Sequence, residues 1–147
     1  MSYQNILVPV DGSDISFSAI KHAATLAKAF NSKLTAISIV ADDPFAASDF
    51  YYSTEMLKEY IDEAIKNANE ALDQAESIAK QLGVQIDRKV VRDLVSAESI
   101  TKTAEELKTE LIVMGSHGRK GFQKFFLGSL AQDVLGQTKI PVFIVKQ

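Results

Sequence analysis

The sequence predicts an α/β protein built on a single doubly wound, five-stranded parallel sheet with helices on both faces. Short runs rich in β-branched residues alternate with segments of helical spacing along the whole chain. Alternating βαβ units imply parallel strands joined by right-handed crossovers. The 147 residues, 46% of them apolar, suffice for one core, so we expect one domain over residues 1–147.

Five strands are expected, at Asn5–Val10, Leu34–Val40, Val84–Val91, Glu110–Met114 and Pro141–Lys146. The first and fourth are continuously apolar, which is typical of central strands covered on both faces. The third alternates polar and apolar residues and so suits an edge of the sheet. The predicted strand order is therefore 3-2-1-4-5.

Four helices are expected between these strands, each with apolar residues recurring every three or four positions. The longest has its apolar series from Leu57 to Leu82 and ends at Gly83. The other three are expected at about Ser13–Phe30, Ser96–Leu107 and Ser129–Gln137.

The composition excludes several classes of function. With 16 basic and 19 acidic residues, the net charge of −3 provides no basic field for nucleic acid or an anionic membrane. The absence of cysteine excludes disulfides and thiolate chemistry. No apolar run approaches the roughly 20 residues that span a bilayer, and the amino terminus resembles no secretion signal. A cytoplasmic location is expected.

The predicted topology also places a ligand site. The chain reverses direction between the first and fourth strands, so the loops Val10–Ser13 and Gly115–Leu127 should meet over one crevice. Open α/β sheets bind ligands at such switch points.

The second of these loops has a glycine pattern suited to phosphate. Gly115, Gly118 and the pair Gly128-Ser129 follow an apolar strand and precede a helix. Glycines let backbone N–H groups approach an anion, and the helix N-terminus adds further donors. Three cations, Arg119, Lys120 and Lys124, lie in this loop, with no carboxylate from residue 115 to 132. The alternatives are an ordinary glycine-rich turn and a solvated charged loop. Neither a P-loop nor a Gly-x-Gly-x-x-Gly fingerprint is present.

Two polar residues near the crevice have competing interpretations. The run Ser129-Leu130-Ala131-Gln132 resembles a capping box, although Ser129 could also donate to phosphate. Asp11 follows a central strand and could bond ribose or base, or help to hold a divalent ion. Alternatively, Asp11, Ser13 or Asp14 caps the first helix.

No catalytic set is recognisable. The two histidines, His22 and His117, have no partners at metal-ligand or catalytic spacing, and no nucleophile elbow occurs. We therefore expect no catalytic or metal-ligating residue.

Two further segments carry predictions about surfaces. The strand at residues 141–146 is apolar and falls at an edge, where antiparallel pairing with a second copy would form a homodimer; shielding by the last helix is the alternative. The aromatic-rich connection Ala41–Thr54 could cover a base, meet a partner or pack on its own domain.

The chain resembles the universal stress protein family in its ATP-binding branch. The likeness lies in Val8-Pro9-Val10-Asp11-Gly12-Ser13, in Met114-Gly115-Ser116-His117-Gly118-Arg119 with Gly128-Ser129, and in the closing strand. It implies an adenine nucleotide alpha hydrolase-like fold and a homodimer formed through the last strand. It also implies ATP, with or without Mg or Mn, and at most weak ATPase activity.

The resemblance also assigns roles to residues. Pro9 and Asp11 would line the base and ribose side, and Ile39 would meet adenine. The ribose and phosphates would be wrapped by Gly115, Ser116, His117, Gly118, Arg119, Lys120 and Gly121, and the phosphate tail held by Gly128, Ser129 and Leu130.

The implied function is a nucleotide-responsive stress factor with an unknown protein partner. The alternatives are a slow ATPase or phosphoryl or nucleotidyl transferase, and a partner-binding module with an empty pocket. Valine at Gly118 or Gly128 is expected to abolish nucleotide binding and to leave the fold largely intact.

Overall fold

A computed structural model describes residues 3–41, 53–118 and 127–146. The described strands and helices alternate in the order β1 (Asn5–Pro9), α1 (Asp14–Phe30), β2 (Lys33–Val40), α2 (Thr54–Gln81), β3 (Ile86–Arg92), α3 (Ala97–Glu106), β4 (Leu111–Gly115), α4 (Ser129–Gln137) and β5 (Val142–Val145). Each strand begins and ends within two residues of its expected range.

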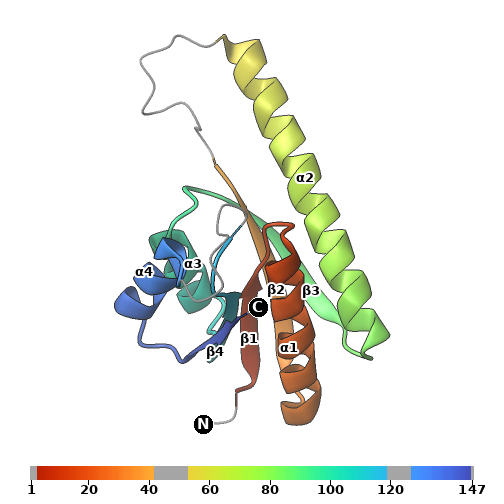
Figure 1. Ribbon diagram of the computed structural model, residues 1–147. Coiled ribbons are helices and arrows are strands. Elements are labelled where there is room, and N and C mark those ends of the chain that lie inside the picture. Colours follow the sequence, from red (N-terminus) through yellow and green to blue (C-terminus); the bar gives the residue numbers. More distant parts are fainter. Residues whose placement is uncertain (1–2, 42–52, 119–126, 147) are drawn as a thin grey trace.

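The five strands form one sheet in the order β3-β2-β1-β4-β5, and every neighbouring pair is parallel. The predicted fold class and strand order are confirmed. Helices α1 and α2 cover one face of the sheet, and α3 and α4 cover the other (Figure 1). Alternate residues of β1 supply the two cores: Ile6 and Val8 face the first pair of helices, and Leu7 faces the second.

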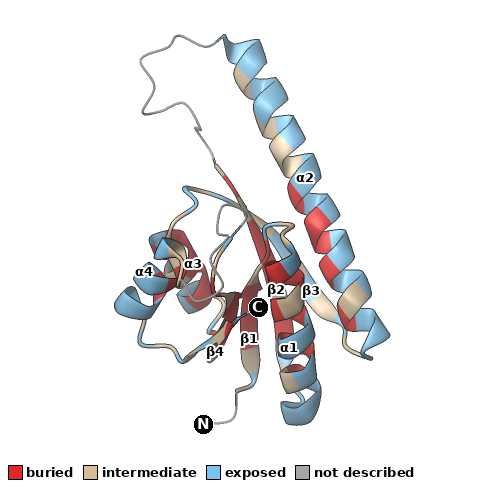
Figure 2. Ribbon diagram, in the orientation of Figure 1, coloured by how far each residue is buried: buried red, intermediate tan, exposed pale blue. Residues whose placement is uncertain are grey.

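The apolar series of helix α2 is buried along only part of its length. Its buried residues lie between Ala68 and Ala79, in the half nearer its carboxyl end. The amino-terminal half extends past the sheet, and Leu57 and Ile61 of this series are only half-buried (Figure 2). The apolar period predicted the helix correctly but could not show how far the sheet reaches. Its end is as expected, because Gly83 adopts a φ of 79° after the last turn.

Polar contacts fasten the edge strand β3 to α2. The Arg88 guanidinium forms ion pairs with Asp73 and Glu76 and donates to the Asn69 carbonyl at 3.0 Å. The hydrogen bond to Asp73 is the main cause that raises the pKa of Arg88. Arg88, like any arginine, stays charged throughout the physiological pH range.

The central strands β1 and β4 part before they end. They pair at Ile6 with Leu111 and at Leu7 with Ile112, and no later pair between them is found in the described chain. Beyond that point the chain that follows β1 remains hydrogen-bonded to β2, because the Val10 N–H donates to the Ile37 carbonyl at 2.8 Å. Strand β4 stays with β5 as far as the Gly115–Val145 pair. The sheet is thus split at its carboxyl edge, at the predicted switch point.

Candidate nucleotide site

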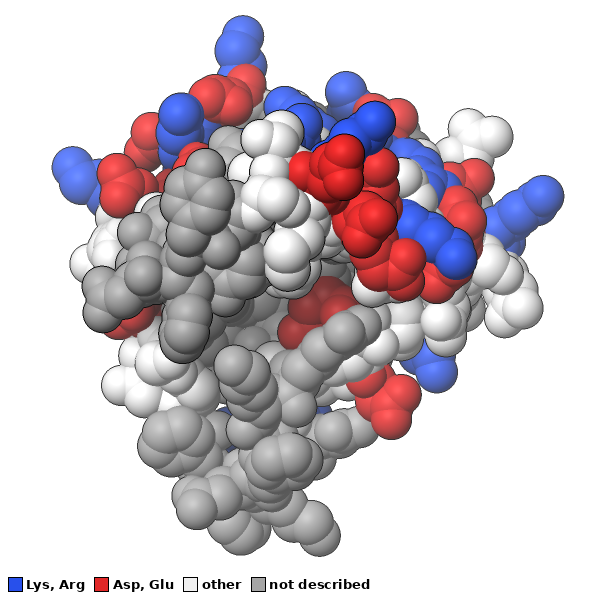
Figure 3. Space-filling view, turned by 90° about the horizontal axis from the view of Figure 1, so that it is seen from above, with Lys and Arg blue, Asp and Glu red and all other residues white. Residues whose placement is uncertain are grey.

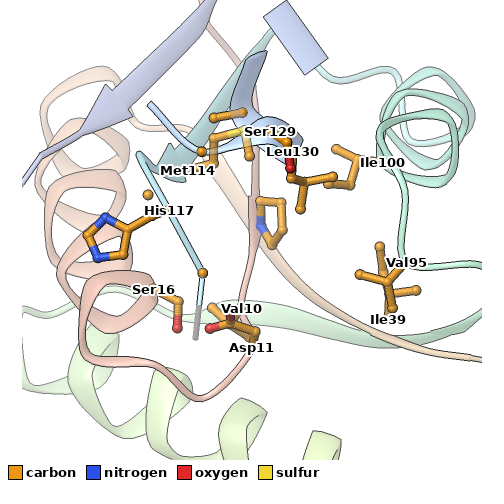
Figure 4. A pocket seen from close by; sticks show the side chains of 15 residues that line it. Val10, Asp11, Ser16, Ile39, Val95, Ile100, Met114, His117, Ser129 and Leu130 are labelled. Atoms are coloured by element: carbon orange, nitrogen blue, oxygen red, sulfur yellow. The ribbon is translucent and has the colours of Figure 1, made fainter. Parts of the chain in front are cut away.

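A cavity of about 650 Å³ lies in the split between β1 and β4. Its lining comes from the ends of β1, β2 and β4, from the connection before α3 and from the first turn of α4 (Figure 4). Figure 3 looks onto this edge of the molecule and shows a hollow with an acidic side chain inside it. The volume lies within the range of small-molecule sites.

Asp11 stands on the β1 wall of the cavity and connects it to α1. One carboxylate oxygen, Oδ1, accepts from the Ser13 N–H at 2.9 Å and from the Ser13 hydroxyl at 2.5 Å. Ser13 is itself the cap of α1, because its Oγ accepts from the Ser16 N–H at 3.3 Å. Ser13 therefore does the capping, and Asp11 braces it while lining the cavity.

The glycine loop closes the opposite wall. Gly118 faces Asp11 so closely that a Cβ placed on it would lie 3.0 Å from Asp11 Oδ2. At Gly115 a Cβ would lie 3.0 Å from Ile15 Cγ1, so this glycine lets α1 pack against β4. The two turns that are remote in sequence therefore meet, as the topology predicted.

Ser116 lies behind this wall. It is buried and does not line the cavity, unlike its neighbours Gly115 and His117. Its N–H donates to the Val145 carbonyl at 2.8 Å, and its carbonyl accepts from the Gly128 N–H at 2.6 Å. Ser116 joins the loop to β5 and α4, because its backbone is used on both sides.

The start of α4 departs from the expected capping box. The N-cap is Gly128, no side chain caps the helix within the described chain, and Ser129 is the first helical residue. The Gln132 side chain donates instead to the Leu127 carbonyl at 2.5 Å. The capping-box interpretation was wrong. The first-turn N–H groups of α4 are left for water or for an anionic ligand.

Gly128 is constrained by backbone rather than by the cavity. A Cβ there would lie 3.0 Å from the Ser116 carbonyl oxygen and 3.2 Å from His117 Cα. Neither atom can move without shifting the chain. This close backbone approach argues against the expectation that valine at Gly128 spares the fold, whereas Gly118 has only the end of a side chain near it.

The cavity has two chemically different parts. Apolar side chains form one, with Ile39, Ile100, Met114 and Leu130 around it. The other has Asp11, Ser16, His117 and the glycines (Figure 4). His117 Nδ1 lies 3.2 Å from the Ser116 hydroxyl. An aromatic base suits the first part, and hydroxyl and phosphate groups suit the second.

Nine of the predicted site residues line this one cavity: Pro9, Asp11, Ile39, Gly115, His117, Gly118, Gly128, Ser129 and Leu130. Arg119, Lys120 and Gly121, together with most of the aromatic connection 41–54, lie outside the described residues. What the structure establishes is the convergence of these residues, and their roles toward a ligand stay predictions.

Six lining residues were not predicted: Val10, Ser16, Val95, Ile100, Met114 and Ala131. Met114 and Ile100 lie in apolar patterns that predict core residues, and both are buried. Val95 is different, because it follows the edge strand β3. The predicted crevice lies between the central strands, so the sequence gave no reason to place Val95 there. Its position at the carboxyl end of a strand is the one available signal.

Comparisons with known proteins agree with this geometry. Residues 2–146 match the model of the Universal stress protein family. The chain belongs to the universal stress protein family. A family member of Methanocaldococcus jannaschii is 37% identical over 145 residues, which cover 99% of this chain and 83% of the relative.

Solved structures of the family share the fold. The UspA protein of Lactobacillus plantarum superposes with a TM-score of 0.84 at 24% identity, covering 99% of each chain. A universal stress protein of Archaeoglobus fulgidus, solved in complex with dAMP, has a TM-score of 0.72 at 26% identity and covers 99% of this chain and 100% of its own.

Two searches of the described residues bear on function. They contain no group of three or more histidines and carboxylates placed to hold a metal ion. None of their helices combines the length and apolar character needed to cross a membrane.

Proposed function

We propose that this universal stress protein binds adenine nucleotides, ATP among them, and that occupancy of the cavity alters a homodimer and thereby a partner interaction. The observation that carries the proposal is the meeting of Asp11 with the Gly115–Gly118 loop and the uncapped start of α4 around one cavity. The dAMP complex of the Archaeoglobus fulgidus relative supports the ligand class.

In this proposal the base lies against the apolar part of the cavity, near Pro9 and Ile39. Asp11 accepts from ribose hydroxyls through Oδ2, because Oδ1 is taken by Ser13. The phosphates then run past Gly118 and Gly128 to the first turn of α4, where the N–H groups of Ser129 and Leu130 face the cavity, the Gly128 N–H being bonded to the Ser116 carbonyl. Arg119 and Lys120, with Gly121, complete the phosphate contacts. A Mg or Mn ion that accompanies the phosphates would be held largely by the phosphate oxygens. Among the described residues, Asp11 is the one carboxylate that lines the cavity.

The rival function is a slow ATPase or a phosphoryl or nucleotidyl transferase. Such an enzyme needs a positioned nucleophile in addition to charge stabilisation. Asp11 and His117 are the titratable side chains that line the described cavity, and they come from opposite walls. His117 contacts the Ser116 hydroxyl rather than a carboxylate, so the described residues contain no base that a second acid orients in this cavity.

Analysis of the nucleotide retained on purification tests the proposal. We expect the protein to carry adenine nucleotide that mass spectrometry identifies, and to bind added ATP or AMP in calorimetry. Intact ATP after prolonged incubation supports a binding switch, whereas steady conversion to ADP or AMP supports the enzyme. A protein that neither retains nor binds adenine nucleotide contradicts both.

The dimer is proposed to form through residues 141–146. Strand β5 pairs with β4 on one side and is the last strand of the sheet on the other. Phe143 of this strand is 40% exposed, and its ring contacts His22 of α1 at a centroid distance of 5.8 Å. An apolar edge strand of this kind favours pairing with a second copy.

The substitution Phe143→Lys is expected to convert this dimer to a monomer, because lysine on an edge strand opposes pairing. Sedimentation equilibrium at micromolar concentration should give twice the 16.1 kDa chain mass for the unmodified protein and the single mass for the variant. Phe30→Lys is the matched control, since Phe30 is 44% exposed but lies on α1. A monomeric mass for the unmodified protein contradicts the proposed dimer.

A further inference from the structure

A second hollow adjoins the proposed nucleotide cavity. It has a volume of about 360 Å³ and is lined by the start of α3, by the two residues before it and by one side of α4 along its whole length. Val95, Ser129 and Leu130 line both hollows, so the two lie side by side. A mononucleotide placed as proposed leaves this second hollow without a role.

The walls of the second hollow are held in place by the protein itself. Ser96 caps α3 by accepting from the Ser99 N–H at 3.2 Å, and the Ser99 hydroxyl donates to the Leu94 carbonyl. Ala97 and Ala131 are buried in the core cluster that joins α3 to α4. A ligand therefore meets a formed site and need not order it, which favours binding.

The chemistry of the lining differs from that of the phosphate side. Glu98 and Asp133 contribute carboxylates, and Gln137 contributes an amide. Two carboxylates repel a free phosphate but accept hydrogen bonds from hydroxyl groups, and bonds to charged acceptors are the stronger kind. The exposed Val95 offers an apolar surface beside them. This combination of a polar rim and a small apolar surface suits a sugar.

We propose that the second hollow binds a sugar joined by phosphate to the nucleotide in the first cavity, so that the preferred ligand class is a nucleoside diphosphate sugar. The inference rests on the proposed nucleotide function. Ser129 lies where the hollows meet, at the amino terminus of α4, and the diphosphate would cross there. The second hollow then provides the hydrogen-bond acceptors that the sugar hydroxyls need.

Calorimetry with two ligands of equal phosphate charge tests the inference. ADP-ribose carries the sugar, and the β-methyl ester of ADP replaces it with a methyl group. We expect ADP-ribose to bind about tenfold more tightly, the equivalent of one or two hydrogen bonds to charged acceptors. In Glu98→Ala and Asp133→Ala this preference should fall below about threefold, while the affinity for the methyl ester stays unchanged.

Glu105→Ala is the matched control, because Glu105 is an exposed acid of the same helix as Glu98 and does not line the hollow. It should keep the full preference. Equal affinity for the two ligands in the unmodified protein overturns the inference and leaves the proposed function intact, as does a preference that survives both substitutions. If neither ligand binds and AMP does not bind either, the proposed function fails together with the inference.

Discussion

Replacing Gly118 with valine should weaken the binding of AMP or ATP by about 100-fold while the protein stays folded. The added Cβ would lie 3.0 Å from Asp11 Oδ2, and its methyl groups would occupy the cavity between the two loops. A misfit of about 3 kcal/mol in a packed site corresponds to that loss. Gly118 does not have a positive φ, so valine imposes no backbone strain of that kind.

The measurement is titration calorimetry, with urea unfolding as the check on the fold. Gly136→Val is the matched control, because a Cβ at Gly136 meets nothing within 4 Å. The control should bind nucleotide normally, and both variants should unfold within about 0.5 kcal/mol of the unmodified protein. Unchanged affinity in Gly118→Val would show that the ligand does not pass between Asp11 and the glycine loop.

Valine at Gly128 should instead lower the free energy of unfolding by about 3 kcal/mol and abolish nucleotide binding as well. Its Cβ would press on the Ser116 carbonyl oxygen and on His117 Cα, both held by the β4-to-α4 connection. Forcing backbone apart in a packed region is costlier than displacing a side-chain end. The Gly128-to-Ser116 hydrogen bond would also be strained.

Urea unfolding of Gly118→Val, Gly128→Val and Gly136→Val side by side separates the two roles of glycine at this site. The order of stability should put Gly128→Val well below the other two. Equal stability of Gly128→Val and Gly136→Val would contradict this. It would mean that the close packing of α4 against the backbone of residues 116–117 does not require glycine at position 128.

The fold was predictable because two kinds of pattern agreed. The continuous apolar character of residues 6–8 and 111–113 marks central strands, and the alternation in β3 marks an edge. With these positions assigned, the rule that crossovers are short and right-handed gave the predicted strand order 3-2-1-4-5. The convergence of Asp11 with the glycine loop follows from that order, since both leave central strands at the same edge.

Other features depend on contacts that a single sequence does not display. Ser129 and Gln132 have the spacing of a capping box, yet Gln132 reaches the Leu127 carbonyl because the chain enters α4 through an extended Gly128. The amino-terminal half of α2 has the apolar period of a buried helix but no sheet beneath it. Val95 reaches the cavity from an edge strand, across the width of β2.

The early parting of β1 and β4 has a consequence for how fast a ligand can enter. In the described chain their pairing stops at Leu7 and Ile112, so no hydrogen bond between these two strands beyond that pair has to break for a ligand to pass between them. The association rate of the ligand should then be limited by diffusion and electrostatic steering rather than by the opening of the sheet. The dissociation rate would be set separately, by the groups that bind the ligand inside the cavity.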